Sequence, residues 1–168
     1  MSARTGGIRI GSGLDVHPFD GGADRPLVLA GVLVPDGPPL AGHSDADVAT
    51  HAVTDALLGA LALGDLGSWF GVDRPGVADA DSIGLLEVVV DRVHGEGWVV
   101  GNLDLTIVAQ RPRLAAHRDT MRERLAAAVA VAEDAVSVKF TTTDHLGSIG
   151  RGEGIAAWAT VLVQVAPD

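Results

Sequence analysis

The apolar positions of the chain recur with two periods, and these periods predict strands and helices in a definite order. Alternation of period two predicts strands over residues 8–17 and 136–143, and two more strand candidates lie at 98–109 and 155–165. An apolar, β-branched stretch over 27–34 is interrupted by Gly31, so we expect a hairpin or a bend there. Turn-forming residues follow it at 36–39.

Apolar positions three to four residues apart predict helices. Three are expected, over residues 46–63, from 81 or 82 to about 94, and over about 114–133. Ser44 or Asp45 is the candidate cap of the first helix, and Asp81 or Ser82 is that of the second. Loops are expected at residues 64–76, 110–113 and 144–154.

This order, with similar amounts of strand and helix, predicts an α/β domain of the two-layer α+β kind. We expect a small mixed β-sheet with helices packed on one face. One domain over residues 1–168 is expected, because 168 residues, 47% of them apolar, suffice for one core and are too few for two ordinary enzyme domains. The other sheet face, built from apolar strands, must be covered by another subunit.

Charge and cysteine content exclude several classes of protein. Twelve Lys and Arg residues against 22 Asp and Glu residues give a formal net charge of −10, so we expect neither general nucleic-acid binding nor membrane binding. The negative charge does not exclude binding of a phosphorylated small molecule, because such binding needs only a few local hydrogen-bond donors or a cation. The absence of cysteine excludes disulfides and thiolate chemistry. The N-terminus has no apolar signal core, and we expect a cytoplasmic protein.

Two short patterns carry carboxylates and imidazoles. Asp15 and His17 stand two residues apart on the first predicted strand, so they share one face, with Val16 expected to point into the core. A surface hydrogen-bonded pair is the alternative for this common pattern. The second pattern consists of polar residues four apart: His43 just before the predicted helix, then Asp47, His51 and Asp55. Each step of four residues advances about 40° around a helix, so these side chains form one stripe.

The stripe has two interpretations. A solvated helix face is one, but the stripe lacks the Lys, Arg and Glu residues that such faces favour. In the other, Asp15, His17 and His51 form a three-ligand set with a free fourth position, as in catalytic zinc sites. His94 and His117 are expected at the surface, and the sequence does not decide whether His145 is a surface or a functional residue.

Two further segments are candidates for binding. Thr141, Thr142, Thr143 and Asp144 precede a glycine-rich loop that contains Arg151, and hydroxyl and N–H groups of this kind can hold a phosphate. A strand end followed by a flexible loop is the alternative. The loop is neither a Walker A motif nor a dinucleotide fingerprint. In residues 64–67, an aspartate between glycines can accept hydrogen bonds from a polyol or form an ordinary turn.

Together these segments resemble the 2-C-methyl-D-erythritol 2,4-cyclodiphosphate synthase family. The resemblance covers nearly the whole chain in the right order, and its combination of motifs is highly specific. It is carried by residues 9–17, 42–49, 51, 54–59, 64–67, 141–143 and 150–154.

The resemblance implies a cyclising phosphorus–oxygen lyase. Such an enzyme converts 4-diphosphocytidyl-2-C-methyl-D-erythritol 2-phosphate into the 2,4-cyclodiphosphate and releases CMP, in the non-mevalonate route to isoprenoid precursors. It implies a homotrimer with active sites between adjacent subunits. It further implies one zinc ion per subunit on Asp15, His17 and His51, and magnesium or manganese with the substrate diphosphate.

The resemblance also implies the roles of individual residues. His43 and Thr142 match the positions credited with transition-state stabilisation. The residues that match substrate-binding positions are Asp15, Val16, His17, His43, Ser44, Asp65, Leu66, Gly67, Phe70, Asp73, Ala109, Pro112, Arg113, Leu114, Thr141, Thr142, Thr143, Asp144 and Arg151. Arg151 and Glu153 match residues near the three-fold axis, where an isoprenoid diphosphate can bind.

The chain departs from the family at three places. Residues 71–74 are Gly-Val-Asp-Arg where many members have Pro-Asp-Thr-Asp, so a carboxylate used there is either missing or replaced by Asp73. Asp144 stands where glutamate is common, and Ser148 where an aromatic residue often lies. Two other functions use the same residues: a zinc-dependent phosphoesterase with an activated water, and a non-catalytic trimer that binds isoprenoid diphosphates. Residues 109–114 match the cytosine pocket of the family, and the threonine run beside this match favours the cyclase.

Overall fold

The computed structural model describes residues 7–19, 22, 25–35, 37–42, 44–71 and 81–167. The strands are β1 (Ile8–Pro18), β2 (Leu27–Leu29), β3 (Val32–Val34), β4 (Trp98–Val108), β5 (Val136–Thr141) and β6 (Gly154–Val165). The helices are α1 (Val48–Ala60), α2 (Leu66–Phe70), α3 (Ser82–Gly95), α4 (Arg118–Ala128) and α5 (Gly147–Gly150), with 3-10 turns at Ala115–His117 and Glu133–Ala135.

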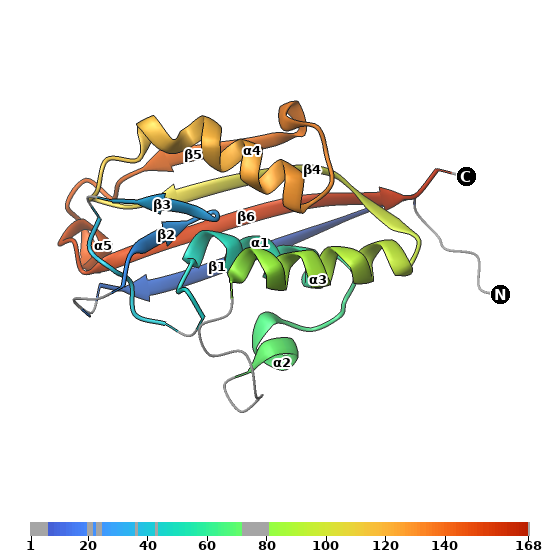
Figure 1. Cartoon of the computed structure of the whole chain (residues 1–168), viewed down its shortest axis with the longest axis horizontal. Coiled ribbons are helices and arrows are strands. Elements are labelled where there is room, and N and C mark those ends of the chain that lie inside the picture. Colours follow the sequence, from blue (N-terminus) through green and yellow to red (C-terminus); the bar gives the residue numbers. More distant parts are fainter. Residues whose placement is uncertain are drawn as a thin grey trace.

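Four long strands form one mixed sheet in the order β1-β6-β4-β5. β4 and β5 are parallel, because α4 connects them, and the other two pairs are antiparallel. The short strands β2 and β3 form a separate hairpin, as expected from Gly31. Helices α1, α3 and α4 lie together on one side of the sheet (Figure 1). The predicted class, a mixed sheet with helices on one face, is confirmed.

Helix α1 sits directly on strand β1, and glycines make this possible. A Cβ atom on Gly11 would lie 1.9 Å from the carbonyl oxygen of Ala56, and one on Gly13 would lie 2.1 Å from that of Ala52. Since residues two apart on a strand share a face, Asp15 and His17 follow these glycines on the side that α1 covers. The close approach therefore brings the helix backbone within reach of both side chains.

The opposite face of the sheet carries exposed apolar side chains on β1 and β6, whereas polar side chains such as Asp104 and Lys139 lie on it at β4 and β5. Ile10, Leu14 and Val16 of β1 and Trp158 of β6 each expose more than half of their surface. The expectation that Val16 points into the core is wrong, because the glycines, Asp15 and His17 occupy the covered side and alternation turns Val16 outward. In the described part of the chain, no helix is both long and apolar enough to cross a membrane.

Two helices end earlier than their apolar pattern predicts. α1 ends at Ala60 and α4 at Ala128, and each is followed two residues later by an alanine with positive φ, Ala62 and Ala130. The next N–H then donates to the carbonyl five residues back, which closes the helix end. This motif usually carries glycine, so the sequence offered no signal for it.

The helix starts also differ in part from the expectation. α1 begins at Val48 and is capped by Asp47 rather than by Ser44 or Asp45, because Ser44 and Ala46 have positive φ values and interrupt the helix. α3 is capped by Asp81, one of its two candidates. Helix α2 was not predicted within the loop at 64–76.

Candidate metal and nucleotide sites

The structure brings Asp15, His17 and His51 together at the junction of β1 and α1. Oδ2 of Asp15 lies 2.9 Å from Nε2 of His17 and 3.1 Å from Nδ1 of His51. One ligand atom from each of the three lies within 4.8 Å of the others. Strand alternation supplies two of these groups, and the close packing of α1 on β1 supplies the third.

This geometry fits a tetrahedral ion. Zinc bound at 2.0–2.1 Å separates its ligand atoms by about 3.3 Å, close to both observed distances. One carboxylate with two imidazoles is also a donor set that zinc favours. Among the described residues, no fourth His, Asp or Glu joins the cluster, so it leaves one coordination position for water or substrate.

Electrostatics keep Asp15 anionic. Partial burial alone would raise its pKa, but hydrogen bonds and positive charge from His17 and His51 outweigh burial and hold the pKa well below its usual range. The carboxylate is therefore ready to bind a cation at neutral pH. His51 is buried, which places the cluster at the inner end of a cavity rather than on an open surface.

Asp47 does not belong to the metal cluster. It is fully buried, and its carboxylate accepts hydrogen bonds from the backbone N–H groups of Ala30 (2.8 Å) and Gly31 (2.6 Å) and from Thr50 Oγ1 (2.7 Å). Burial raises the pKa of this carboxyl, although these bonds oppose the shift. Asp47 thus ties the β2–β3 hairpin to α1, and the interpretation of the stripe as a solvated face is wrong.

Asp55 connects the metal cluster to the loop that begins at Gly64. Its Oδ1 accepts a 2.6 Å hydrogen bond from the N–H of Leu66. Burial raises its pKa, that bond lowers it, and the charges of Asp65 and Asp15 raise it further. Asp65 itself caps α2 by accepting a 2.7 Å bond from Ser68 N–H, so the turn interpretation holds for one of its oxygens. Asp55, Asp65, Leu66 and Gly67 line an open cavity of about 510 Å³ with the metal cluster.

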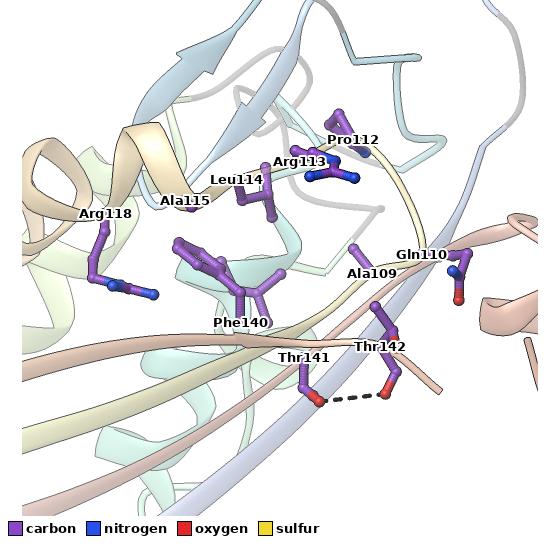
Figure 2. A pocket seen from close by; sticks show the side chains of 11 residues that line it. Ala109, Gln110, Pro112, Arg113, Leu114, Ala115, Arg118, Phe140, Thr141 and Thr142 are labelled. Atoms are coloured by element: carbon purple, nitrogen blue, oxygen red, sulfur yellow. Dashed lines mark hydrogen bonds between the residues drawn. The ribbon is translucent and has the colours of Figure 1, made fainter. Parts of the chain in front are cut away.

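A second cavity, of about 450 Å³, lies at the C-terminal ends of β4 and β5. Figure 2 shows the 110–115 segment on one side of it and Thr141 and Thr142 on the other. The structure gathers here the predicted residues Ala109, Pro112, Arg113, Leu114, Thr141 and Thr142.

Sequence reasoning missed several lining residues of this second cavity. Phe140 precedes the threonine run, and the guanidinium of Arg118 stacks 5.3 Å above its ring. The signal for Phe140 was its place on the same strand, whereas Arg118 enters from the start of α4 and had no local signal. Ile107 and Ala115 were missed as well, whereas Gln110 belongs to the predicted 109–114 segment.

Other predicted residues line neither of the two cavities. Thr143 Oγ1 donates to the carbonyl of Leu146 (2.6 Å), and Asp144 Oδ1 accepts a 3.3 Å bond from Thr142. Arg151 is exposed and forms a 2.6 Å ion pair with Glu153. Phe70 is half-buried on α2 and stacks against Trp69.

The remaining predictions concern Ser44, the other histidines and the segment before α3. Ser44 is buried with its Oγ 3.2 Å from His51 Nε2. His94 and His145 are exposed, and His117 is half-exposed. The predictions for His43, Asp73, Val72 and Arg74 lie outside the described residues.

The comparisons with known proteins agree with this geometry. The model of the YgbB family matches residues 8–164. The chain belongs to the YgbB family. A relative from Cyanothece sp., named 2-C-methyl-D-erythritol 2,4-cyclodiphosphate synthase, is 52% identical over 160 residues, which cover 95% of this chain and 98% of the relative.

Solved structures show the same fold as this YgbB chain. The bifunctional IspDF from Campylobacter jejuni matches with a TM-score of 0.88 and 39% identity over 94% of this chain, which spans only 42% of that longer protein. A CDP complex of IspF from Plasmodium falciparum matches with a TM-score of 0.82 and 29% identity, covering 96% of this chain and 98% of that one.

Proposed function

We propose that the chain is a metal-dependent cyclase that converts 4-diphosphocytidyl-2-C-methyl-D-erythritol 2-phosphate into 2-C-methyl-D-erythritol 2,4-cyclodiphosphate and CMP. This reaction belongs to non-mevalonate isoprenoid precursor biosynthesis. The observation that carries the proposal is the cluster of Asp15, His17 and His51, with one position left for substrate, in a chain half identical to synthases of that name. The single domain expected over residues 1–168 would carry the whole reaction.

The metal cluster and the loop beside it would hold the reacting end of the substrate. Asp15, His17 and His51 would bind one zinc ion, which supplies charge neutralisation and polarisation of a phosphate oxygen. Magnesium or manganese would accompany the substrate diphosphate. Asp65, Leu66 and Gly67 would bind the methylerythritol hydroxyls, and Asp55 would keep this loop in place through its bond to Leu66 N–H.

The second cavity would hold the nucleotide. Ala109, Pro112, Arg113 and Leu114 would enclose the cytosine, and Thr141 and Thr142, which line the same cavity, would contact the sugar and phosphates. Thr143 and Asp144 follow directly in the chain and keep their proposed contacts as predictions. The CDP bound by the Plasmodium falciparum protein supports a nucleotide in a fold of this kind. Ser44, Val16, Phe70, Asp73 and Arg151 keep their proposed substrate contacts as predictions.

The chemical step transfers a phosphoryl group within one molecule. An oxygen of the 2-phosphate attacks the β-phosphorus of the diphosphate, the bond between that phosphorus and the bridging oxygen breaks, and CMP leaves with its electrons. The attacking phosphate is already ionised at neutral pH, so the step needs alignment of two anions more than a base. His43 and Thr142 are the residues proposed to stabilise the transition state.

We further propose a homotrimer with active sites between subunits. The apolar part of the outer face on β1 and β6, where Ile10, Leu14 and Trp158 are exposed, is a surface that a second copy would cover. The two cavities of one chain share no lining residue, so a site that uses both is compatible with contributions from neighbouring copies. An isoprenoid diphosphate on the three-fold axis near Arg151 and Glu153, and the cytoplasmic location, stay predictions.

Phosphorus NMR tests the reaction directly. Protein incubated with the substrate and magnesium should release CMP and yield two coupled ring phosphorus signals. Linear products with solvent oxygen would favour the phosphoesterase instead, and binding without turnover would favour the non-catalytic trimer. Light scattering should give about three times the chain mass of 17.1 kDa, whereas a clean monomer would contradict the intersubunit site.

A further inference from the structure

The second nitrogen of His51 has its own buried partners. Nδ1 faces Asp15 in the metal cluster, whereas Nε2 points the other way, 3.0 Å from Ser82 Oγ and 3.2 Å from Ser44 Oγ. The exposed fractions of His51, Ser82 and Ser44 are 6%, 1% and 3%. Water therefore has little access to this side of the ring, and protein hydroxyls decide its hydrogen bonds.

Asp45 determines the direction of these bonds. A carboxylate only accepts, and the Asp45 carboxylate accepts from the Ser82 hydroxyl, from Ser82 N–H (3.2 Å) and from Asp47 N–H (3.2 Å). The single hydroxyl proton of Ser82 is thus committed to Asp45. The Ser82 oxygen is left to accept, and two donors face it: Nε2–H of His51 at 3.0 Å and the Ser44 hydroxyl at 3.1 Å.

We propose that Ser82 and Asp45 are positioning residues for His51 as a metal ligand. The relay from Nε2–H to Ser82 Oγ–H to the Asp45 carboxylate keeps the imidazole proton on Nε2 and directs the Nδ1 lone pair at the metal cluster. Metal-binding histidines commonly donate their other N–H to a carboxylate or carbonyl, and here a serine hydroxyl stands between them. The inference rests on the proposed metal site.

The local backbone is shaped to hold this relay. Ser44 and Ala46 both have positive φ, 56° and 57°, a conformation that side chains with a Cβ adopt only under tertiary constraint. Arg25 donates from its guanidinium to the carbonyls of Ser44 and Gly42 and holds this segment from the other side. The constraint turns Asp45 toward the first residue of α3.

A substitution at Ser82 allows an effect on the metal ligand to be distinguished from an effect on substrate binding. Ser82 lies in the second layer behind His51 and lines neither of the two cavities. Its hydroxyl therefore affects the metal cluster through its bonds to His51, Asp45 and Ser44. A substrate contact would not explain a change in metal affinity at this position.

Zinc affinity of the purified protein, measured by competition with a chromogenic chelator, tests the proposal. Ser82→Ala should bind zinc about tenfold more weakly, the lower end of the effect of losing such a partner, because Ser44 Oγ remains near Nε2. Ser82→Thr keeps a hydroxyl and should restore most of the affinity. Thr54→Val is the matched control, since it removes a buried hydroxyl of α1 whose partner, among the described residues, is the Thr50 carbonyl rather than a metal ligand.

A spectroscopic measurement distinguishes positioning from general stability. In the zinc-loaded protein labelled with nitrogen-15, the His51 Nε2–H proton should be visible and exchange slowly with water, and Ser82→Ala should speed this exchange. Asp45→Asn, which keeps the size of the side chain, should change both readouts in the same direction and serves if Ser82→Ala does not fold.

The outcomes separate this inference from the proposed function. Wild-type affinity and slow exchange in Ser82→Ala, or an equal loss in Thr54→Val, would overturn the relay and leave the metal site standing. A wild-type protein that takes up no zinc would overturn the metal site itself.

Discussion

The two cavities of the chain are organised by different forces. At the metal cluster, side chains are hydrogen-bonded to one another: His51 contacts Asp15 on one side and Ser82 on the other, and Asp55 bonds to the next loop. At the second cavity, called the nucleotide cavity after its proposed role, apolar side chains such as Ile107 are buried and the side chains of Arg113, Arg118, Thr141 and Thr142 are exposed. The first site is preorganised by polar contacts, and the second selects by shape and charge.

The two cavities also carry opposite charge. Asp15, Asp55 and Asp65 line the metal cavity, whereas Arg113 and Arg118 line the nucleotide cavity. Five of the twelve basic residues of an otherwise acidic chain lie within residues 111–124: Arg111, Arg113, Arg118, Arg122 and Arg124. The acidic cavity therefore suits cations and the basic one suits the anionic end of a nucleotide, which the overall charge of −10 conceals.

Removing a metal ligand should have the largest effect and leave the other cavity intact. His51→Gln should abolish zinc binding and lower turnover by about 10²–10³ or more, since loss of one charge-stabilising group costs that much. CMP affinity should stay at the wild-type value, because the cavities share no residue. Elemental analysis and calorimetry measure the two quantities, and full zinc retention would remove His51 from the ligand set.

Replacing Asp47, the buried carboxylate that caps α1, tests how far polar contacts near the metal cluster stabilise the fold. Asp47→Ala leaves the N–H groups of Ala30 and Gly31 without their acceptor, and each such buried group costs about 1–3 kcal/mol. We expect the free energy of unfolding in urea to fall by about 3 kcal/mol. Asp134→Ala at an exposed site is the control. A loss under about 1 kcal/mol would mean that the hairpin is held by other contacts.

Filling the nucleotide cavity should change binding without touching the metal. Ala109 is 8% exposed and lines the cavity, so Ala109→Leu should obstruct the base and raise KM about tenfold. Zinc affinity should not change. Ala127→Leu on the exposed side of α4 is the control for added bulk. Equal KM values for the two variants would show that the base does not occupy this cavity.

The smallest effect is expected outside both cavities. Lys139 donates a 2.7 Å bond to Asp104 and lowers the pKa of that carboxyl. A lowered pKa in the folded state means that the stabilisation is present above the ordinary pKa of about 3.9 and is lost as pH falls through the lowered value. Lys139→Met should cost at most about 1 kcal/mol at pH 7 and nothing at the acid end. Urea unfolding across pH measures this, and a constant difference would contradict it.

The site could be predicted from sequence where its residues belong to one element. The spacing of Asp15 and His17 follows from strand alternation, and the position of His51 follows from the apolar period of α1. Both periods are properties of a single segment. Residue types beside glycine-rich turns, rather than any period, identified Asp65 and the threonine run, and the family resemblance then assigned their roles.

The rest depended on contacts between distant segments. Only the packing of α1 against Gly11 and Gly13 decides which face of β1 is covered, and therefore that Val16 points outward. Asp47 is bonded to Gly31 of the hairpin, and Ser82 is bonded to His51 of α1. Both partners are distant along the chain. A side-chain period states which residues share a face, but only tertiary packing states what lies against that face.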